Sequence, residues 1–282
     1  MNENAFAALG NEHRIDILRT LVVAVENEES GVPFTELYDR TDIDSSSQFS
    51  YHLDRLRNEF VREVDGEYRP TSAGERVVRA VRAGMYTETP SFDPVTVDGL
   101  CPACESTTLR AAYTDPHLQV ACSDCGATVV TYDLSPAEAE GRTEIETLRA
   151  CNRRTLREYR TAIAGSCPTC NGLTTVAIEA GPEDGYACVA TCSQCDLRLF
   201  APVELPLFGH PAVVSFYWER GVDVTELPLW RLPEFIGNAD RRVRDREPLA
   251  LDITLHHGES SLTARIDGDG TVSVDERSLE KT

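Results

Sequence analysis

The chain has 282 residues, which is enough for two compact domains and does not require one continuous core. It contains neither a run of roughly 20 apolar residues nor a signal peptide, so we expect a cytoplasmic protein without a membrane partner. The formal net charge of −20 argues against a nucleic-acid-binding surface of the usual strongly basic kind.

Residues 1–86 contain three predicted helices, then a hairpin, then a fourth helix. Asn11 caps the first helix, over HRIDILRTLVVAVE, and FTELYDRT forms the second, which buries Phe34 and Leu37. A capping box formed by Ser45 and Gln48 begins the third helix. Apolar stripes predict the buried faces of the first and third helices, at Ile15, Leu18, Val22 and Val25 and at Phe49, Leu53, Leu56 and Phe60.

The opposite face of the third helix carries small polar side chains followed by arginines. Hydroxyl and amide groups near the start of a helix can approach base edges closely, and arginines farther along can reach phosphates. This layout is typical of a DNA recognition helix, and an ordinary solvated face is the alternative. His52 lies beside the apolar stripe, where packing or a phosphate contact is expected rather than catalysis. The predicted DNA-contact residues, including two from the hairpin, are Ser46, Ser47, Gln48, Ser50, Tyr51, Arg55, Arg57, Arg62 and Arg69.

Two short alternating segments around Asp65-Gly66 predict the hairpin, because this dipeptide is a strong signal for a two-residue turn. The hairpin would form a wing with Arg62 and Arg69 available to the DNA backbone. A second capping box, formed by Ser72 and Glu75, is predicted to open the fourth helix. The apolar stripe of that helix consists of Val77, Val78 and Val81.

The segments LGNEHRIDILRTL and SSSQFSYHLDRLRNEFV and the Asp-Gly hairpin resemble ArsR-type winged helix-turn-helix regulators, in the variety found in haloarchaea. The resemblance covers residues 1–86, which we therefore predict to be a winged helix-turn-helix DNA-binding domain. It implies a homodimer that binds double-stranded promoter DNA. The cysteines with which the family senses metals on the second helix are absent from FTELYDRT, so that kind of sensing is not expected.

Eight of the ten cysteines fall in four CxxC pairs, which predict metal binding. A reducing cytosol keeps disulfides rare, and two CxxC turns complete a tetrahedral four-thiolate shell around zinc. Such a shell leaves no position for water, so each site would be structural. The alternative is that the CxxC pairs are redox dithiols. Spacing does not decide whether the two CxxC pairs that share an ion come from the same four-cysteine unit or from different units, and pairing within a unit is the simpler hypothesis. The predicted ligands of two zinc ions per chain are Cys101, Cys104, Cys122 and Cys125, and Cys167, Cys170, Cys192 and Cys195.

The two four-cysteine units resemble zinc ribbons and look like an internal duplication within residues 100–204. A linker over 87–99 precedes the first unit, 100–134, and a helix over 135–165 joins it to the second, 166–203. Gly126 and Asn171-Gly172 are expected to supply the left-handed backbone that such knuckles need. Cys151 and Cys188 fit neither quartet. We expect both to be small buried residues, with extra ligands or sensors as the alternative.

Residues 205–282 predict a segment of mixed helix and sheet. A short helix contains Val213, Val214, Phe216 and Tyr217, and the alternation after it predicts a three-stranded antiparallel meander. Its turns are expected at His257-Gly258 and Asp267-Gly268. The aromatic side chains of this segment are expected to be core, although they could line a small-molecule pocket; they are Phe216, Tyr217, Trp218 and Trp230. We assign no role to the histidines of this segment, His210, His256 and His257.

The negative charge is spread along the whole chain. Residues 1–90, 91–204 and 205–282 carry 10, 8 and 9 basic residues against 17, 16 and 14 acidic ones, and only Lys281 is lysine. This composition resembles that of proteins from halophilic archaea, where molar salt screens self-repulsion within about 3 Å. Net charge is then weak evidence about partners.

These elements predict an α+β protein with an N-terminal winged helix-turn-helix, two zinc-ribbon-like units and a small C-terminal antiparallel β segment. Its expected function is sequence-specific DNA-binding transcription regulation, as a dimeric ArsR-like repressor whose C-terminal region binds a small-molecule or protein effector. The alternative is a basal-type archaeal transcription factor, which also combines a winged helix with a zinc ribbon and acts through protein partners. An enzyme is not expected, because P-loop, GxSxG, HExxH and GxGxxG motifs are absent.

Overall fold

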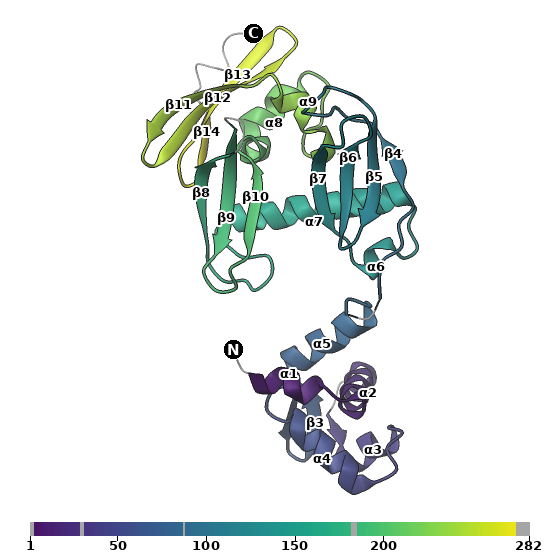
Figure 1. The fold of residues 1–282 in the computed structure, drawn as a ribbon. Helices are drawn as coiled ribbons and strands as arrows, with labels where there is room; N and C mark the ends of the chain where they lie inside the picture. The colour runs from purple at the N-terminus through teal and green to yellow at the C-terminus, as the bar shows by residue number, and fades with distance from the viewer. Residues whose placement is uncertain (1–2, 29–30, 87, 182–184, 275–282) are drawn as a thin grey trace. The chain divides into compact units, whose positions relative to one another are not determined.

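The computed structural model describes residues 3–28, 31–86, 88–181 and 185–274. The chain divides into two compact units, Met1–Pro90 with Ser135–Ala137 and Ser91–Leu134 with Glu138–Thr282. Each combines helices with antiparallel sheet, so the predicted α+β class is confirmed (Figure 1). None of the helices in the described ranges is long and apolar enough to cross a bilayer.

The first unit packs its helices around a small sheet of strand order β1-β3-β2. Its buried core includes Ile17, Leu21, Leu37, Phe49 and Leu53. The elements are α1 (Glu3–Leu9), α2 (Glu12–Glu28), β1 (Val32–Pro33), α3 (Phe34–Asp39), α4 (Ser46–Leu56), β2 (Val61–Val64), β3 (Glu67–Pro70) and α5 (Ser72–Arg82).

Local signals in this unit are mostly confirmed. The Asn11 side chain accepts a hydrogen bond from the Arg14 N–H at 3.4 Å, and Ser45 Oγ accepts one from the Gln48 N–H at 3.5 Å. Asp65 and Gly66, with φ of 54° and 81°, form the two-residue turn between β2 and β3.

The predicted cap of α5 was wrong. Thr71, one residue earlier than Ser72, caps this helix through a 3.2 Å bond from the Gly74 N–H to its Oγ1. Its hydroxyl also donates to the Glu59 carbonyl at 2.6 Å. This second bond connects the cap to the turn after α4, so a tertiary contact decided between two adjacent hydroxyl residues.

The buried face of α2 is wider than its predicted stripe. Leu18 and Val22 are buried as expected, whereas Ile15 and Val25 are half-buried and Ile17 is fully buried. The cause is that α1, α3, α4, α5 and β3 all pack against α2. A helix surrounded on several sides buries residues outside a single stripe.

The second unit contains two small sheets joined by a long helix. The first has the order β4-β5-β6-β7 and the second β10-β9-β8, so β7 and β10 are edge strands. Figure 1 shows α7 running across both sheets. The elements are β4 (Val95–Val97), β5 (Leu109–Thr114), β6 (His117–Cys122), β7 (Thr128–Asp133), α7 (Glu144–Ile163), β8 (Thr174–Ala180), β9 (Tyr186–Cys192) and β10 (Arg198–Pro202), with α6 (Pro136–Ala139) divided between the two units.

Two predictions for this region need correction. The stretch 87–99 is more than a linker, because β4 lies within it and pairs with β5. The predicted helix over 135–165 is two helices. Gly141, with φ of 69°, separates them, and Thr143 begins α7 in a capping box with Glu146.

The C-terminal region forms a third sheet of four strands, where three were predicted. The additional strand, β11, has the sequence DRRVRDR, and its one apolar residue, Val243, gives no alternating pattern. Apolar side chains of β8, β9, β12 and β13 share one core. The elements are η1 (Leu205–Gly209), α8 (Pro211–Trp218), η2 (Leu229–Arg231), α9 (Pro233–Ile236), β11 (Asp240–Arg246), β12 (Leu249–His257), β13 (Ser260–Ile266) and β14 (Val272–Val274).

The four aromatic residues do not form one cluster. Phe216 and Tyr217 are buried in the C-terminal core, whereas Trp230 is buried in the core of the first sheet. Trp218 is 65% exposed. The core interpretation therefore holds for three of them and is wrong for Trp218.

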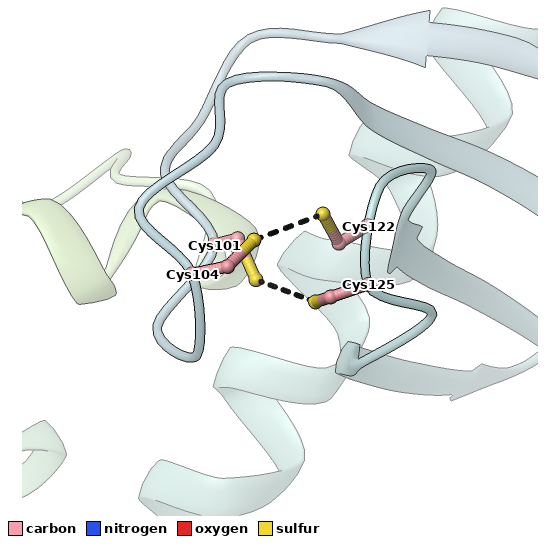
Figure 2. A group of neighbouring side chains, drawn as sticks. All are labelled: Cys101, Cys104, Cys122 and Cys125. Atoms are coloured by element: carbon pink, nitrogen blue, oxygen red, sulfur yellow. Dashed lines mark hydrogen bonds between the residues drawn. The ribbon is translucent and has the colours of Figure 1, made fainter.

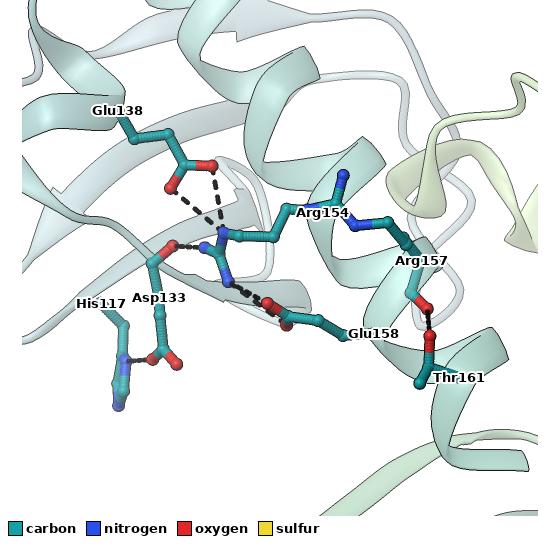
Figure 3. A network of polar contacts seen from close by, with 7 residues as sticks. All are labelled: His117, Asp133, Glu138, Arg154, Arg157, Glu158 and Thr161. Carbon is teal, nitrogen blue, oxygen red and sulfur yellow. Dashed lines mark hydrogen bonds and ion pairs between the residues drawn. The ribbon is translucent and has the colours of Figure 1, made fainter. Parts of the chain in front are cut away.

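Polar contacts fix both sheets to α7. Asn152 Oδ1 accepts hydrogen bonds from the Tyr132 hydroxyl at 3.0 Å and from the Leu229 N–H at 2.8 Å. Arg154 donates to Glu138, Glu158 and the Asp133 carbonyl (Figure 3). For the second sheet, Tyr159 donates to the Cys188 carbonyl of β9 at 3.2 Å. One helix thus positions two sheets.

Candidate metal centres and candidate nucleic-acid interface

The eight CxxC cysteines form two groups, and each group belongs to one sheet. The thiols of Cys101, Cys104, Cys122 and Cys125 lie within 4.8 Å of one another, as do those of Cys167, Cys170, Cys192 and Cys195. Pairing within each unit is therefore confirmed. In every knuckle the first cysteine is buried and the second is exposed.

The sulfur positions match a tetrahedral metal site. Cys101 Sγ lies 3.6 Å from Cys125 Sγ, and Cys104 Sγ lies 3.6 Å from Cys122 Sγ (Figure 2). The corresponding distances in the second group are 3.7 and 3.5 Å. Four sulfurs about 2.3 Å from a central ion would be about 3.8 Å apart, whereas a disulfide needs about 2.05 Å. The geometry fits an ion with four thiolate ligands.

Hydrogen bonds favour the thiolate at particular sulfurs. The backbone N–H groups of Cys125 and Asp124 lower the pKa of Cys122 to about 6. At Cys104 the Ser106 N–H also lowers the pKa, but the neighbouring thiols outweigh it and raise the pKa to about 12. Without a cation, the four adjacent thiols therefore cannot all ionise readily, because a thiolate at one sulfur raises the pKa of its neighbours. A divalent cation stabilises all four thiolates at once, so the donor set fits a metal as well as the distances do.

All four knuckles share one backbone conformation. The N–H of the first cysteine donates to the carbonyl five residues later at 2.8 or 2.9 Å. The residue after the second cysteine has φ between 57° and 75° in each knuckle. With the matching strand order, this repetition supports the internal duplication. The left-handed residues are Glu105, Gly126, Asn171 and Asp196.

The left-handed conformation predicted for Gly126 and Asn171 is confirmed, but the same prediction for Gly172 was wrong. Gly172 has no positive φ, and a Cβ there would lie 2.7 Å from the Gln194 side chain and 3.2 Å from Cys170 Sγ. Its N–H donates to that sulfur at 3.4 Å. This glycine therefore allows close packing of the two knuckles.

Cys151 and Cys188 lie outside both metal groups, as expected. Both are fully buried, Cys151 in the core of the first sheet and Cys188 in the C-terminal core. Burial raises the pKa of each thiol, to about 12 for Cys151. They behave as small apolar core residues.

On α4, the predicted polar face is exposed. Phe49, Leu53 and Leu56 are buried on one side, while the predicted contact residues at the start of the helix lie at the surface, with Ser50 half-buried. Tyr51 is 55% exposed, and the Arg55 guanidinium lies 5.3 Å from its ring centroid. The structure thus leaves Ser46, Ser47, Gln48, Tyr51 and Arg55 exposed, and it places Tyr51 and Arg55 in contact.

The other three arginines that were predicted to contact DNA differ in their surroundings. Arg57 forms ion pairs with Asp54 at 3.3 Å and with Glu63 of β2 at 2.6 Å. Arg62 and Arg69 are cross-strand partners in the hairpin, with Arg62 exposed and Arg69 half-buried near Glu67 at 4.0 Å. Arg57 therefore links α4 to the hairpin.

His52 is buried rather than directed at a phosphate. Its ring packs 5.3 Å from that of His13, and its Nδ1 has no hydrogen-bond partner within the described chain. Burial, with the charges of His13 and Arg14, lowers the pKa of His52. The neutral ring serves as core, so the packed alternative is the one observed.

Comparisons with known proteins separate the chain at the same place as the two units. A family model described as Domain of unknown function (DUF7347) matches residues 2–81, and one described as Domain of unknown function (DUF7351) matches residues 98–272. No curated protein matches the chain. A solved structure titled "Crystal structure of a hypothetical protein at 2.2 A resolution" is 11% identical over 88% of this chain and 87% of that chain, with a TM-score of 0.26, which supports no argument. The model of the family described as Domain of unknown function (DUF7351) covers more than half of the residues, so the chain belongs to that family.

Proposed function

We propose that the chain is a sequence-specific DNA-binding transcription regulator with two structural zinc ions. In this proposal the first unit is a winged helix-turn-helix, α4 is its recognition helix, and β2 and β3 form the wing. The observation that carries the proposal is the exposed face of α4, with short polar side chains at its N-terminal end and the hairpin directly after it.

The chemistry of this face suits base recognition. In helix-turn-helix proteins the N-terminal residues of the recognition helix contact base edges. Ser46, Ser47 and Gln48 lie in that part of α4 and are exposed. Arg55 stacks near Tyr51, which limits its conformations while its N–H donors stay available to a phosphate.

The charge of the surface limits how it binds. Asp54 and Glu63 neutralise Arg57, so we expect Arg55 and Arg62 to make the main phosphate contacts, with Arg69 joining them despite its longer pair with Glu67 at 4.0 Å. Affinity from phosphate contacts falls steeply with salt. At the molar salt that the composition suggests, direct base contacts and dimerisation must supply more of the affinity.

Homodimer formation is part of the proposal. Phe6 on α1 is 84% exposed, and Met85 and Tyr86 after α5 are 56% and 77% exposed. We propose that these side chains belong to the dimer interface, because interfaces cover contiguous exposed apolar surface. A dimer would place two copies of α4 on two half-sites about one helical turn of DNA apart.

Zinc is the proposed metal because four thiolates in tetrahedral geometry are its usual structural shell. Four protein ligands leave no coordination position for water, so the ions would stabilise the sheets and not hydrolyse a substrate. Elemental analysis of the purified chain distinguishes zinc from iron.

Genome-wide footprinting at native salt tests the regulator proposal. We expect occupancy at a small number of sites that share a palindromic sequence. Occupancy at most active promoters would instead support a basal transcription factor, and absence of DNA enrichment would contradict both.

Substitutions on α4 are expected to separate affinity from specificity. Arg55→Ala should weaken binding to all DNA sequences by about fivefold to tenfold, because it removes a phosphate contact. Ser47→Ala should reduce the preference for the selected site over a site changed at one base pair, where a base contact is worth about 1–3 kcal/mol. Fluorescence anisotropy with both DNA duplexes measures the two effects.

Arg76→Ala, at an exposed arginine of α5, is the control and should bind both duplexes like the unmodified chain. Arg57→Ala should have a smaller effect on affinity than Arg55→Ala, because Arg57 is held in two ion pairs. Equal losses for Arg55→Ala, Ser47→Ala and Arg76→Ala on both duplexes would contradict the assignment of α4.

A further inference from the structure

A cleft lies between the two four-cysteine sheets of the second unit, alongside α7. Its volume is about 340 Å³. Its two sides are the edge strands β7, with Val130 and Thr131, and β10, with Phe200 and Ala201. Thr155 of α7 and residues of η2 and α9 also line the cleft. Segments that are far apart in the sequence thus enclose one space.

The lining of the cleft is uncharged. One residue in four of this chain is charged, yet none of the thirteen residues that line the cleft is Asp, Glu, Lys or Arg. An ion that entered the cleft would lose its hydration without gaining a counter-charge. The lining therefore favours neutral molecules, although the Arg198 guanidinium lies against one lining residue, 4.9 Å from the ring centroid of Phe200.

The walls of the cleft are held apart by the contacts that fix each sheet to α7. Asn152 connects this helix to Tyr132 of β7, and the same oxygen accepts from the Leu229 N–H beside the cleft. Tyr159 connects the helix to β9. A cavity between walls fixed in this way is preformed, so binding does not require the sheets to be reordered.

We propose that this cleft binds a neutral aromatic small molecule that carries one hydrogen-bonding group. Its volume falls within the range of roughly 300–1,000 Å³ typical of ligand sites. Phe200, 61% exposed, offers aromatic surface beside the Arg198 guanidinium, which lies 4.9 Å from the centroid of its ring, and the hydroxyls of Thr131 and Thr155 offer hydrogen bonds. Edge strands also present backbone groups that have no partner in their own sheet. This site does not depend on the proposed DNA-binding function.

The test uses two probes that differ by one charge, with the full-length chain at high salt. N-phenyl-1-naphthylamine is neutral and has one N–H donor, and 8-anilino-1-naphthalenesulfonate is the same ring system with a sulfonate. Fluorescence titration should show one neutral molecule bound per chain, and binding at least tenfold weaker for the sulfonate. No binding of the neutral probe, or equal binding of both, would overturn the proposal.

A pair of matched variants locates the probe. Thr155→Trp fills the cleft, whereas Thr161→Trp makes the same change on the same helix at a residue outside the cleft lining. We expect Thr155→Trp to weaken binding of the neutral probe at least tenfold and Thr161→Trp to change it less than twofold. Equal affinity of the two variants would overturn the location.

A second pair of variants avoids placing a tryptophan on α7, where so large a side chain could disturb folding. Phe200 and Leu173 are both large, exposed apolar residues of the second four-cysteine unit, but only Phe200 lines the cleft. Phe200→Ala should weaken binding of the neutral probe about fivefold, and Leu173→Ala should leave it unchanged. Thermal unfolding of each variant confirms that the chain is folded, and equal affinities in this pair would also overturn the proposal.

Discussion

Cys122→Ser is expected to reduce the metal content from two ions per chain to one and to unfold the first four-cysteine sheet. Structural zinc sites in small domains contribute on the order of 10–16 kcal/mol of folding free energy. The first sheet has only a small core, in which Cys101 and Cys122 are themselves buried members. Native mass spectrometry measures the ion count, and circular dichroism with thermal unfolding measures the loss of structure.

Cys151→Ala is the matched control for this prediction. Cys151 is buried in the same core but lies outside the metal group. We expect it to keep both ions and to lower stability only by the cost of a small cavity, on the order of 1 kcal/mol. Retention of two ions by Cys122→Ser, or loss of one by Cys151→Ala, would contradict the assignment of ligands.

Cys192→Ser should remove the other ion and leave the first sheet folded, because each group takes all four ligands from one sheet. Loss of both ions from either variant would show that the two sheets fold only together. The contacts that join both sheets to α7 make partial destabilisation of the partner sheet expected.

Sequence reasoning succeeded where a short segment determines its own conformation. The CxxC pairs, the Asp65-Gly66 turn and the Asn11 and Ser45 caps each depend on chemistry within six residues or fewer. The same holds for the polar and apolar faces of α4, because an isolated amphipathic pattern maps directly onto burial.

Predictions failed where tertiary contacts decided the outcome. The hydroxyls of Thr71 and Ser72 are equivalent as caps, and the bond from Thr71 to the Glu59 carbonyl distinguishes them. In β11, six of seven residues are charged, and the strand forms because it pairs with the apolar β12. A charged edge strand also discourages pairing with another chain, which explains its composition.

The candidate sites show the same limit. All eight candidate metal ligands follow from spacing, but the ion pair between Arg57 and Glu63 requires the hairpin to fold back on α4. The cleft was beyond prediction because it lies between β7 and β10, which are about 70 residues apart in the sequence. A pocket formed by two edge strands has no local sequence signal.

Arg241→Met is expected to lower the free energy of unfolding at pH 7 by about 1–3 kcal/mol, because it leaves the buried Glu204 carboxylate without its partner, whose 28% exposed side chain weakens the pair by solvent screening. Glu204 is 1% exposed, and its carboxylate accepts a hydrogen bond from Arg241 Nε. Arg241 also donates to the carbonyls of Ala239 and Ile236, at 3.2 and 3.0 Å. Denaturant unfolding at constant high salt measures the loss. Arg244→Met is the control on the same strand, since its pair with Asp252 has side chains 47% and 26% exposed and is worth about 1 kcal/mol or less.

The pH dependence of this loss identifies the buried carboxylate as its cause. Burial raises the pKa of Glu204, and Arg241 offsets part of that increase. Without the arginine the pKa rises further, so the folded variant binds a proton at a pH where the unfolded chain, with a carboxyl pKa near 4.3, does not. Its stability deficit should therefore shrink as the pH falls from 7 toward 5, and Glu204→Gln in the Arg241→Met background should remove that dependence. A deficit that is equal at pH 7 and pH 5 would mean that Arg241 stabilises the fold through its carbonyl contacts and not through Glu204.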